Sequence, residues 1–230
     1  MLRLVWISLF ILCSNWAISA SIDPATLLAG VKKKYDLVRD YTASAQLKTN
    51  VLFIKAPLSQ VTVYYKRPDQ LKIKNQKGIS FVPKGTVNIN LNNVLGLRNF
   101  EAIAAGTVLI DGINCEIIKI FPLNDEEDIT RATLYVDPAR LLVVKSIIST
   151  RESGTYQISM QYGAYASWGL PDRVWVEFNT REFKLPKGTT LDYNNGATNV
   201  TTPKGPQKGK VEILYRSYKI NQGVSDEIFR

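Results

Sequence analysis

The fold of this chain is decided by residues 103–121, which read IAAGTVLIDGINCEIIKIF. Two apolar runs rich in β-branched residues, 103–110 and 113–121, flank Asp111-Gly112. An Asp-Gly pair between two such runs is the strongest short-range signal for a two-residue β-hairpin. The segment therefore predicts an antiparallel hairpin, and most of the remaining chain shows patterns of the same kind.

Short strands separated by turn residues are predicted on both sides of this hairpin. From about Tyr41 onward apolar and polar residues alternate with a period of two. Consecutive hairpins form an antiparallel meander, and about ten or eleven strands are too many for a flat open sheet. We therefore expect a mainly β fold whose sheet coils into a barrel, most simply an unclosed half-barrel. The other predicted strands cover 61–66, 71–74, 79–82, 86–91, 132–137, 142–151, 155–166, 172–180 and 210–219.

One amphipathic helix is predicted before the strands. Asp23 is a favourable N-cap and Pro24 a favourable first-turn residue. A second, short helix is predicted near 92–101, and both are candidates for a lid over the sheet. In the first helix, lysines separate apolar residues that recur at helical spacing, namely Leu27, Leu28, Val31 and Tyr35.

The first twenty residues, MLRLVWISLFILCSNWAISA, have the pattern of a secretory signal. Arg3 supplies a positive charge, 4–12 are apolar, and 17–20 offer small residues for cleavage after Ser19 or Ala20. The apolar run is too short for a stable transmembrane helix. We expect residues 1–20 to be a signal peptide and 21–230 a single exported domain. An uncleaved anchor is the alternative.

The residue types that most enzymes and metal sites need are scarce. The chain contains no histidine, which removes His-based metal sites and Ser-His or Cys-His nucleophiles. Cys115 is the only cysteine after the signal and is expected as a small buried hydrophobe, with a reactive thiol as the alternative. The acidic residues 125–128 are consecutive, which favours a solvated turn over a calcium loop. We expect no catalytic residue, no metal and no cofactor.

The positive charge of the chain suggests negatively charged partners. Without Arg3 there are 28 basic and 20 acidic residues, a net charge of +8. For an exported protein this favours anionic lipid head groups or acidic proteins over nucleic acid. A lysine-rich surface without any such partner is the alternative. A long loop is predicted over 185–208, which is rich in Gly, Pro, Thr, Asn and Lys.

The predicted strands share one apolar face across nearly the whole sheet. Val174, Val176 and Phe178 alternate with other residues on one strand, and similar sets occur on the others. One or two short helices would hardly fill so large a coiled sheet, so the apolar concavity indicates a hydrophobic ligand. The alternative is a face filled by helices or by the sheet's own closure. The expected ligand-binding residues are Val63, Tyr65, Leu71, Ile73, Phe81, Met160, Tyr162, Val176, Phe178, Ile213 and Tyr215.

Several phrases, taken in order, resemble the LolA-type periplasmic lipoprotein carriers, also called outer-membrane lipoprotein-sorting proteins. The resemblance covers nearly all of the chain after residue 20. The long 185–208 loop departs from the simplest carriers. The phrases are Tyr41-Thr-Ala43, Val63-Tyr-Tyr-Lys-Arg-Pro-Asp69-Gln-Leu-Lys-Ile73, Asp111-Gly112-Ile-Asn-Cys115-Glu-Ile-Ile, Leu134-Tyr-Val-Asp137-Pro and Tyr215-Arg-Ser-Tyr-Lys-Ile-Asn221.

This resemblance implies an unclosed β-barrel with a helical lid and an apolar inner face that holds acyl chains. It also implies a monomeric, non-catalytic shuttle in the periplasm of a Gram-negative cell, between an inner-membrane donor and an outer-membrane acceptor. In such carriers an arginine holds the lid closed, and Arg67 lies in the most similar phrase. We therefore expect a carrier, or chaperone, of lipoprotein acyl chains or lipids. The alternatives are a periplasmic sensor or interaction module of the same fold without cargo and, third, an enzyme resting on a carboxylate pair.

Overall fold

The computed structural model describes residues 23–51, 54–55, 58–77, 94–97, 99–124, 126–152, 154–179 and 208–230. Strands make up most of these ranges, with one α-helix and two short 3-10 helices, η1 and η2. The elements in chain order are α1 (Pro24–Tyr35), β1 (Asp40–Val51), β2 (Ile54–Lys55), β3 (Ser59–Lys66), β4 (Gln70–Lys77), β5 (Phe100–Ile110), β6 (Ile113–Pro122), β7 (Ile129–Asp137), β8 (Leu142–Thr150), β9 (Gly154–Gln161), η1 (Ala166–Trp168), β10 (Arg173–Asn179), β11 (Lys208–Ile220) and η2 (Asp226–Ile228).

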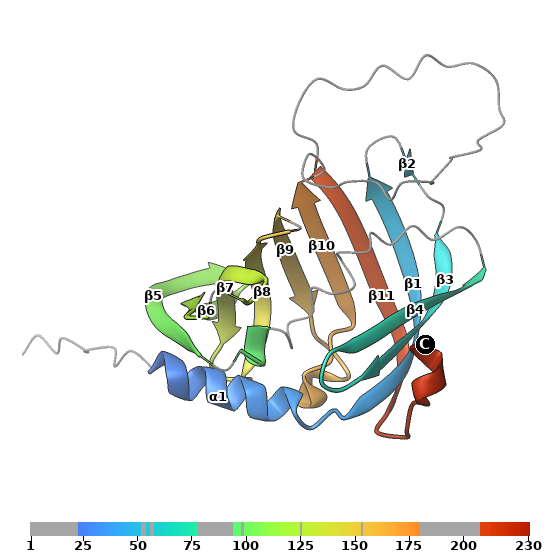
Figure 1. Cartoon of the computed structure of the whole chain (residues 1–230), viewed down its shortest axis with the longest axis horizontal. Coiled ribbons are helices and arrows are strands. Elements are labelled where there is room, and N and C mark those ends of the chain that lie inside the picture. The colour runs from blue at the N-terminus through green and yellow to red at the C-terminus, as the bar shows by residue number, and fades with distance from the viewer. Residues whose placement is uncertain are drawn as a thin grey trace, which may run out of the picture.

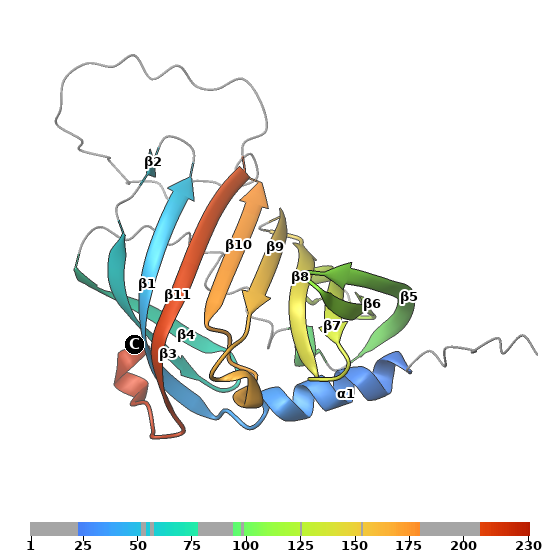
Figure 2. The same ribbon diagram turned by 180° about the vertical axis from the view of Figure 1, so that it is seen from behind.

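The strands form one antiparallel, unclosed sheet. Its order is β4-β3-β1-β11-β10-β9-β8-β7-β6-β5, and the short β2 pairs with β1 beside this row. β4 crosses in front of β11 and β1 in Figure 1 and behind them in Figure 2, so the sheet curls over one of its faces. The expected half-barrel is confirmed.

Helix α1 begins where the sequence predicts. The carboxylate of Asp23 accepts a hydrogen bond from the backbone N–H of Thr26 at 2.8 Å, which satisfies a donor at the start of the helix. Leu27, Leu28 and Val31 are buried. The helix lies along one end of the curved sheet, at the bottom of Figures 1 and 2.

The hairpin at residues 103–121 is also confirmed. Asp111 and Gly112 have φ values of 47° and 80°, so both central residues adopt the left-handed conformation of a tight hairpin turn. The flanking strands β5 and β6 pair from Phe100 with Pro122 to Ile110 with Ile113. β5 therefore starts three residues earlier than expected, at Phe100, which lies within the range predicted for the second helix.

The short helix predicted near 92–101 is present in part of that range. Val94 and Leu95 form a short helical turn, whereas Phe100 already belongs to β5. Phe100 and Ala102 pack on the core while Glu101 is exposed, so a period of two overrides the helical spacing from Phe100 onward. Residues 91–93 and 98 lie outside the described ranges.

The strand predicted over 155–166 is too long. β9 ends at Gln161, and the chain then turns into η1. Gly163 lies against the carboxylate of Asp172, where a Cβ atom would clash, and Gly169 has a φ of 69°. These two glycines belong to a compact turn. The aromatic residues between them make the same stretch resemble a strand in the sequence.

The other predicted strands agree with the structure to within three residues at each end wherever they are described. The strands expected over 79–82 and 86–91 lie outside the described residues. The same holds for the 185–208 loop, except that Lys208 already begins β11. Within the described ranges, no helix has both the length and the hydropathy needed to cross a bilayer.

One hydrophobic cluster joins α1 to the sheet, and the sheet face that carries it is called the inner face below. Residues from nine of the strands, β1, β3 and β5–β11, contribute to it or pack against it, as do Leu71 and Ile73 of β4. Val94, Leu95 and Leu97 belong to the same cluster. Cys115 is buried outside this cluster, as a free thiol.

Candidate functional site

Cross-strand register aligns the apolar residues of the inner face. Side chains directly opposite each other in an antiparallel ladder lie on the same face. Three neighbouring strands meet in this way, because Val176 pairs with Ile158 on β9 and with Val211 on β11. The other aligned pairs are Tyr156 with Phe178, Met160 with Val174, Val174 with Ile213, Val63 with Ile73, and Tyr65 with Leu71.

The structure places ten of the eleven expected ligand-binding residues in the inner cluster or packed against it. Phe81 is the exception, since it lies outside the described residues. The buried members are Val63, Tyr65, Met160, Val176 and Phe178, and the half-buried members are Leu71, Ile73, Tyr162, Ile213 and Tyr215. The inner face is therefore covered at the five buried positions and partly accessible at the five half-buried ones.

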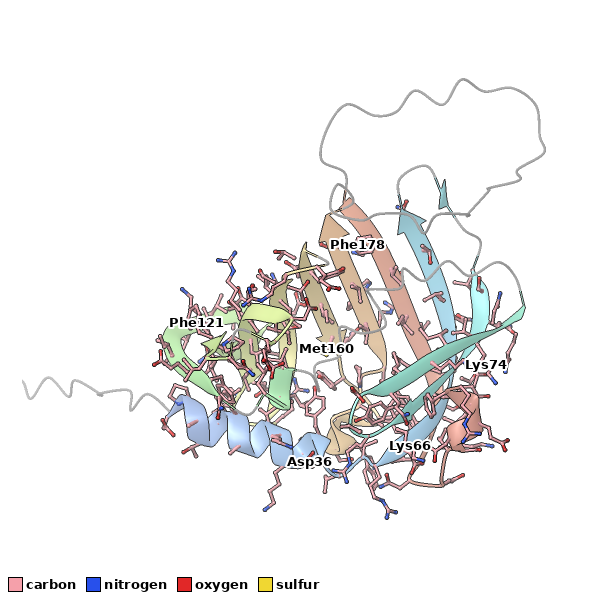
Figure 3. The ribbon with its side chains drawn as sticks, in the orientation of Figure 1. Asp36, Lys66, Lys74, Phe121, Met160 and Phe178 are labelled. Atoms are coloured by element: carbon pink, nitrogen blue, oxygen red, sulfur yellow. The ribbon has the colours of Figure 1, made fainter. Side chains whose placement is uncertain are left out.

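Phe178 packs directly over the backbone of β11. Its register partner is Gly209, and a Cβ atom at Gly209 would lie 2.6 Å from the Phe178 ring. Phe178 is 4% exposed and also contacts Tyr156, with ring centroids 6.1 Å apart. Met160 and Phe178, from the neighbouring strands β9 and β10, are labelled in Figure 3. The glycine makes room for the largest apolar side chain at this end of the inner face.

Two tyrosines connect helix α1 to the sheet by hydrogen bonds. The hydroxyl of Tyr35, at the C-terminal end of α1, lies 2.8 Å from the hydroxyl of Tyr162. Tyr162 donates its own proton to the carbonyl of Val143 on β8 at 2.8 Å, so Tyr35 is the donor of the first bond. Burial raises the pKa of both phenols, so both stay protonated at neutral pH.

The middle of α1 approaches the β7–β8 turn closely. A Cβ atom at Gly30 would lie 3.1 Å from the Leu141 side chain. Lys34 reaches the same turn and donates a hydrogen bond to the carbonyl of Arg140. The helix is thus held at its middle and at its C-terminal end.

A group of five tyrosines in stacked and edge-to-face contact, called the tyrosine cluster, lies on the inner face near the end of α1. Tyr218 contacts Tyr41, Tyr165 and Tyr215 with ring centroids 4.9–5.2 Å apart. Burial raises the pKa of the Tyr215 phenol to about 12, and those of Tyr41 and Tyr218 well above the usual value. The cluster consists of Tyr41, Tyr65, Tyr165, Tyr215 and Tyr218.

Arg67 lies at the C-terminal end of α1. Its guanidinium donates to the backbone carbonyl of Asp36 at 3.2 Å and lies 3.4 Å from the Asp36 carboxylate. Both side chains are partly exposed, at 41% and 43%, so solvent screens the pair. Asp36 is labelled at the end of α1 in Figure 3. Arg67 therefore links the β3–β4 turn to the C-terminal end of the helix that packs on the inner cluster.

The described residues do not assemble any group of three or more His, Cys, Asp or Glu side chains able to hold a metal ion. Burial raises the pKa of the Cys115 thiol, with a smaller contribution from Asp137, and a raised pKa disfavours the reactive thiolate. Apolar packing is what this face offers, and acyl chains or a partner's apolar side chains are the ligands that it fits.

No protein-family model matches the sequence, and neither does any curated protein sequence. Solved structures do match the fold. A LolA superfamily protein from Nitrosomonas europaea aligns with a TM-score of 0.56 at 10% identity, over 91% of this chain and 98% of that one. The chain has a LolA-like fold.

Two further structures support the same fold. A DUF1329 family protein from Desulfovibrio piger aligns with a TM-score of 0.54 at 14% identity, over 91% of this chain and 98% of that one. An outer membrane lipoprotein-sorting protein domain from Vibrio parahaemolyticus aligns with a TM-score of 0.54 at 7% identity, over 90% and 97% of the two chains. Relatives this distant share the LolA-like architecture, whereas the role of this chain must be argued from its own residues.

Several residues of the inner face escape sequence reasoning. Tyr41 and Tyr218 carry a period-two signal but border irregular stretches, and β1 shifts its register between Ser44 and Ala45. The hydrogen bond between Tyr35 and Tyr162 joins residues 127 positions apart, and no local sequence pattern predicts it. The inward position of Ser146 on β8 follows only from the register.

Proposed function

We propose that this protein is a periplasmic carrier that buries the acyl chains of lipoproteins or lipids on its inner face and carries them toward the outer membrane. One observation supports this most: the apolar residues of β3, β4, β9, β10 and β11 align across the register into one wall within a LolA-like fold. Each methylene of the acyl chain that moves from water to such a wall contributes about 0.8 kcal/mol to the free energy of binding. A long acyl chain therefore gains several kcal/mol from contact with it.

Cargo enters when the cover moves. Phe178 and Val176 are 4% and 5% exposed, so a chain that reaches them displaces residues packed over them. The described cover consists of α1 and of Val94–Leu97, both of which pack on the inner cluster. The half-buried Ile213 and Tyr215 mark the accessible part of the wall, where a chain makes its first contact. We propose that α1 and Val94–Leu97 act as the lid.

The proposed carrier must also be exported and must meet a membrane or protein that donates or accepts its cargo. Residues 1–20 are proposed to be a cleaved signal peptide that delivers a monomer to the periplasm of a Gram-negative cell. The positive net charge and the exposed Lys32 and Lys33 on α1 suit approach to anionic lipid surfaces. Release requires an acceptor that offers the chains an equally apolar environment, and loading requires a donor of the same kind. No catalysis is proposed.

A second function is favoured by the burial of this face. Val63 and Tyr65 are 0% and 3% exposed, which is also what a permanently packed core would show. In that case the protein is a sensor or interaction module of the same fold, and its inner face never holds cargo.

Native mass spectrometry separates these two functions. The protein is purified without detergent from cells with intact membranes, and a refolded, delipidated sample serves as control. A carrier shows lipid adducts in the first sample and loses them in the second. Apoprotein alone in both samples would contradict carriage and support the sensor.

A further inference from the structure

Ser146 is a buried hydroxyl in the middle of the apolar inner face. It lies on β8, its residue exposure is 0%, and its Oγ atom has no hydrogen-bond partner among the described residues. Its register partners are Leu134 on β7 and Ile158 on β9, both members of the inner cluster. The side chain of Ser146 therefore shares the inner face with two apolar neighbours.

The register row through Ser146 crosses most of the sheet. Thr49, at the far end of the row, has a partner, so Ser146 is the unpartnered polar side chain among the described members. In order from β5 to β1, the row consists of Ala104, Ile118, Leu134, Ser146, Ile158, Val176, Val211 and Thr49.

An unpartnered hydroxyl at this position destabilises the empty protein. Burial removes the hydroxyl from water, and without a protein partner nothing replaces the lost hydrogen bonds. Alanine would fill nearly the same volume without that penalty. Buried polar groups without partners are rare in native structures, and a ligand that supplies the missing bond is one explanation for such a group.

We propose that the Ser146 hydroxyl donates a hydrogen bond to the carbonyl oxygen of an acyl ester in the bound cargo. This inference rests on the proposed carrier function and specifies which cargo the inner face selects. An ester carbonyl is a hydrogen-bond acceptor without a donor of its own, carries no charge and lies at the head of the acyl chain, so it suits a single donor within an apolar wall. A free carboxylate would bring an unpaired charge into a row that is otherwise apolar up to Thr49.

The test compares two probes of equal chain length, a 1-monoacylglycerol and the matching 1-O-alkylglycerol, which lacks only the carbonyl oxygen. The wild-type protein is expected to bind the ester about fivefold to tenfold more tightly, the usual effect of one hydrogen bond. Ser146→Ala is expected to abolish this preference and to raise the melting temperature. Ser159→Ala is the matched control, because Ser159 lies on the neighbouring strand and on the opposite face.

Each outcome is decisive. Equal affinity of the wild type for ester and ether, or an unchanged preference in Ser146→Ala, would overturn the role of Ser146 while leaving carriage intact. A lower melting temperature of Ser146→Ala would show that the hydroxyl already has a partner and would also overturn it. If the wild type binds neither probe, the carrier function itself fails.

A competition arm distinguishes the two sources of an acyl ester. Bound monoacylglycerol is displaced either with phosphatidylglycerol vesicles or with a diacylglyceryl-cysteine peptide. Displacement by the vesicles indicates a phospholipid cargo, and displacement by the peptide indicates a lipoprotein cargo. Failure of both competitors in the wild type would contradict recognition of the acyl ester.

Discussion

The hydroxyl of Tyr35 on α1 lies 2.8 Å from the hydroxyl of Tyr162, which follows β9. The Tyr162 hydroxyl donates a hydrogen bond to the Val143 carbonyl, so one chain of hydrogen bonds runs from the helix into the sheet. Because α1 packs on the hydrophobic cluster of the inner face, the strength of this chain bears directly on how readily the helix separates from the sheet.

Tyr35→Phe should loosen the helix without changing its apolar packing. The loss of one hydrogen bond is expected to lower the free energy of unfolding by about 1 kcal/mol, measured by urea denaturation. Binding of a fluorescent acyl probe should become faster, since the cover opens more often. Tyr135→Phe is the control, because Tyr135 neighbours the inward Leu134 and lies on the opposite face. Identical association rates for Tyr35→Phe and wild type would exclude α1 as the lid.

Gly209→Ala should disturb the packing of Phe178. The new Cβ atom would lie 2.6 Å from the ring, and a contact that short forces the ring to move. Overpacking of this kind costs about 1–3 kcal/mol in unfolding free energy. In the double variant with Phe178→Leu the penalty of Gly209→Ala should shrink, because the smaller side chain leaves room. A double-mutant cycle measures this coupling, and strictly additive effects would refute the contact.

The sequence predicts the strands well because hairpin turns and period-two alternation are local signals. The Asp111-Gly112 turn and the inward position of Val176 follow from such signals alone. The sequence fails where apolar residues occur in a turn, as after Gln161, where Tyr162 and Ala164 continue the alternation although the strand has ended. There, glycine geometry and tertiary contacts decide the path of the chain.

The inner face is predictable only on strands that keep their alternation. β9 and β10 pair without a register shift, so their inward residues can be identified from the sequence. The pairing of β7 with β8 shifts between Tyr135 and Val136, and a single shift reverses which residues face inward. On β8 the inward residues Val143 and Ser146 are therefore three positions apart, which a strict period of two does not predict.

Alkaline pH should destabilise the protein through its buried tyrosines. Burial raises the pKa of Tyr215 to about 12 in the folded state, against about 10 in an unfolded chain. Below pH 10 the phenol is neutral in both states, so its contribution to stability is complete. Between about pH 10 and 12 the unfolded state ionises first, and stability falls. Urea denaturation at stepped pH measures this loss, and a constant unfolding free energy across that range would contradict the burial of the tyrosine cluster.

Cargo binding should depend only weakly on pH between about 5.5 and 8. The chain contains no histidine, and the resolved pKa shifts lower Asp23 and Asp226 or raise tyrosines and Cys115, all away from this window. Titration of a fluorescent acyl probe at several pH values checks this. A tenfold change in affinity would mean that an ionisable group with a strongly shifted pKa controls the lid.

The most direct test of carriage places a charge on the inner face and the same charge on the outer face. Ile213 is half-buried on the inner face, whereas its neighbour Leu214 pairs with Gln46 and Arg173 on the outer face. Because water reaches a half-buried position, Ile213→Lys should remain folded by circular dichroism and lose at most a few kcal/mol of stability. The measurement is the affinity for a fluorescent acyl chain in Ile213→Lys and Leu214→Lys. Carriage predicts that binding is abolished in the first variant and retained in the second. A folded Ile213→Lys protein that binds as tightly as Leu214→Lys would contradict the inner face as the cargo site.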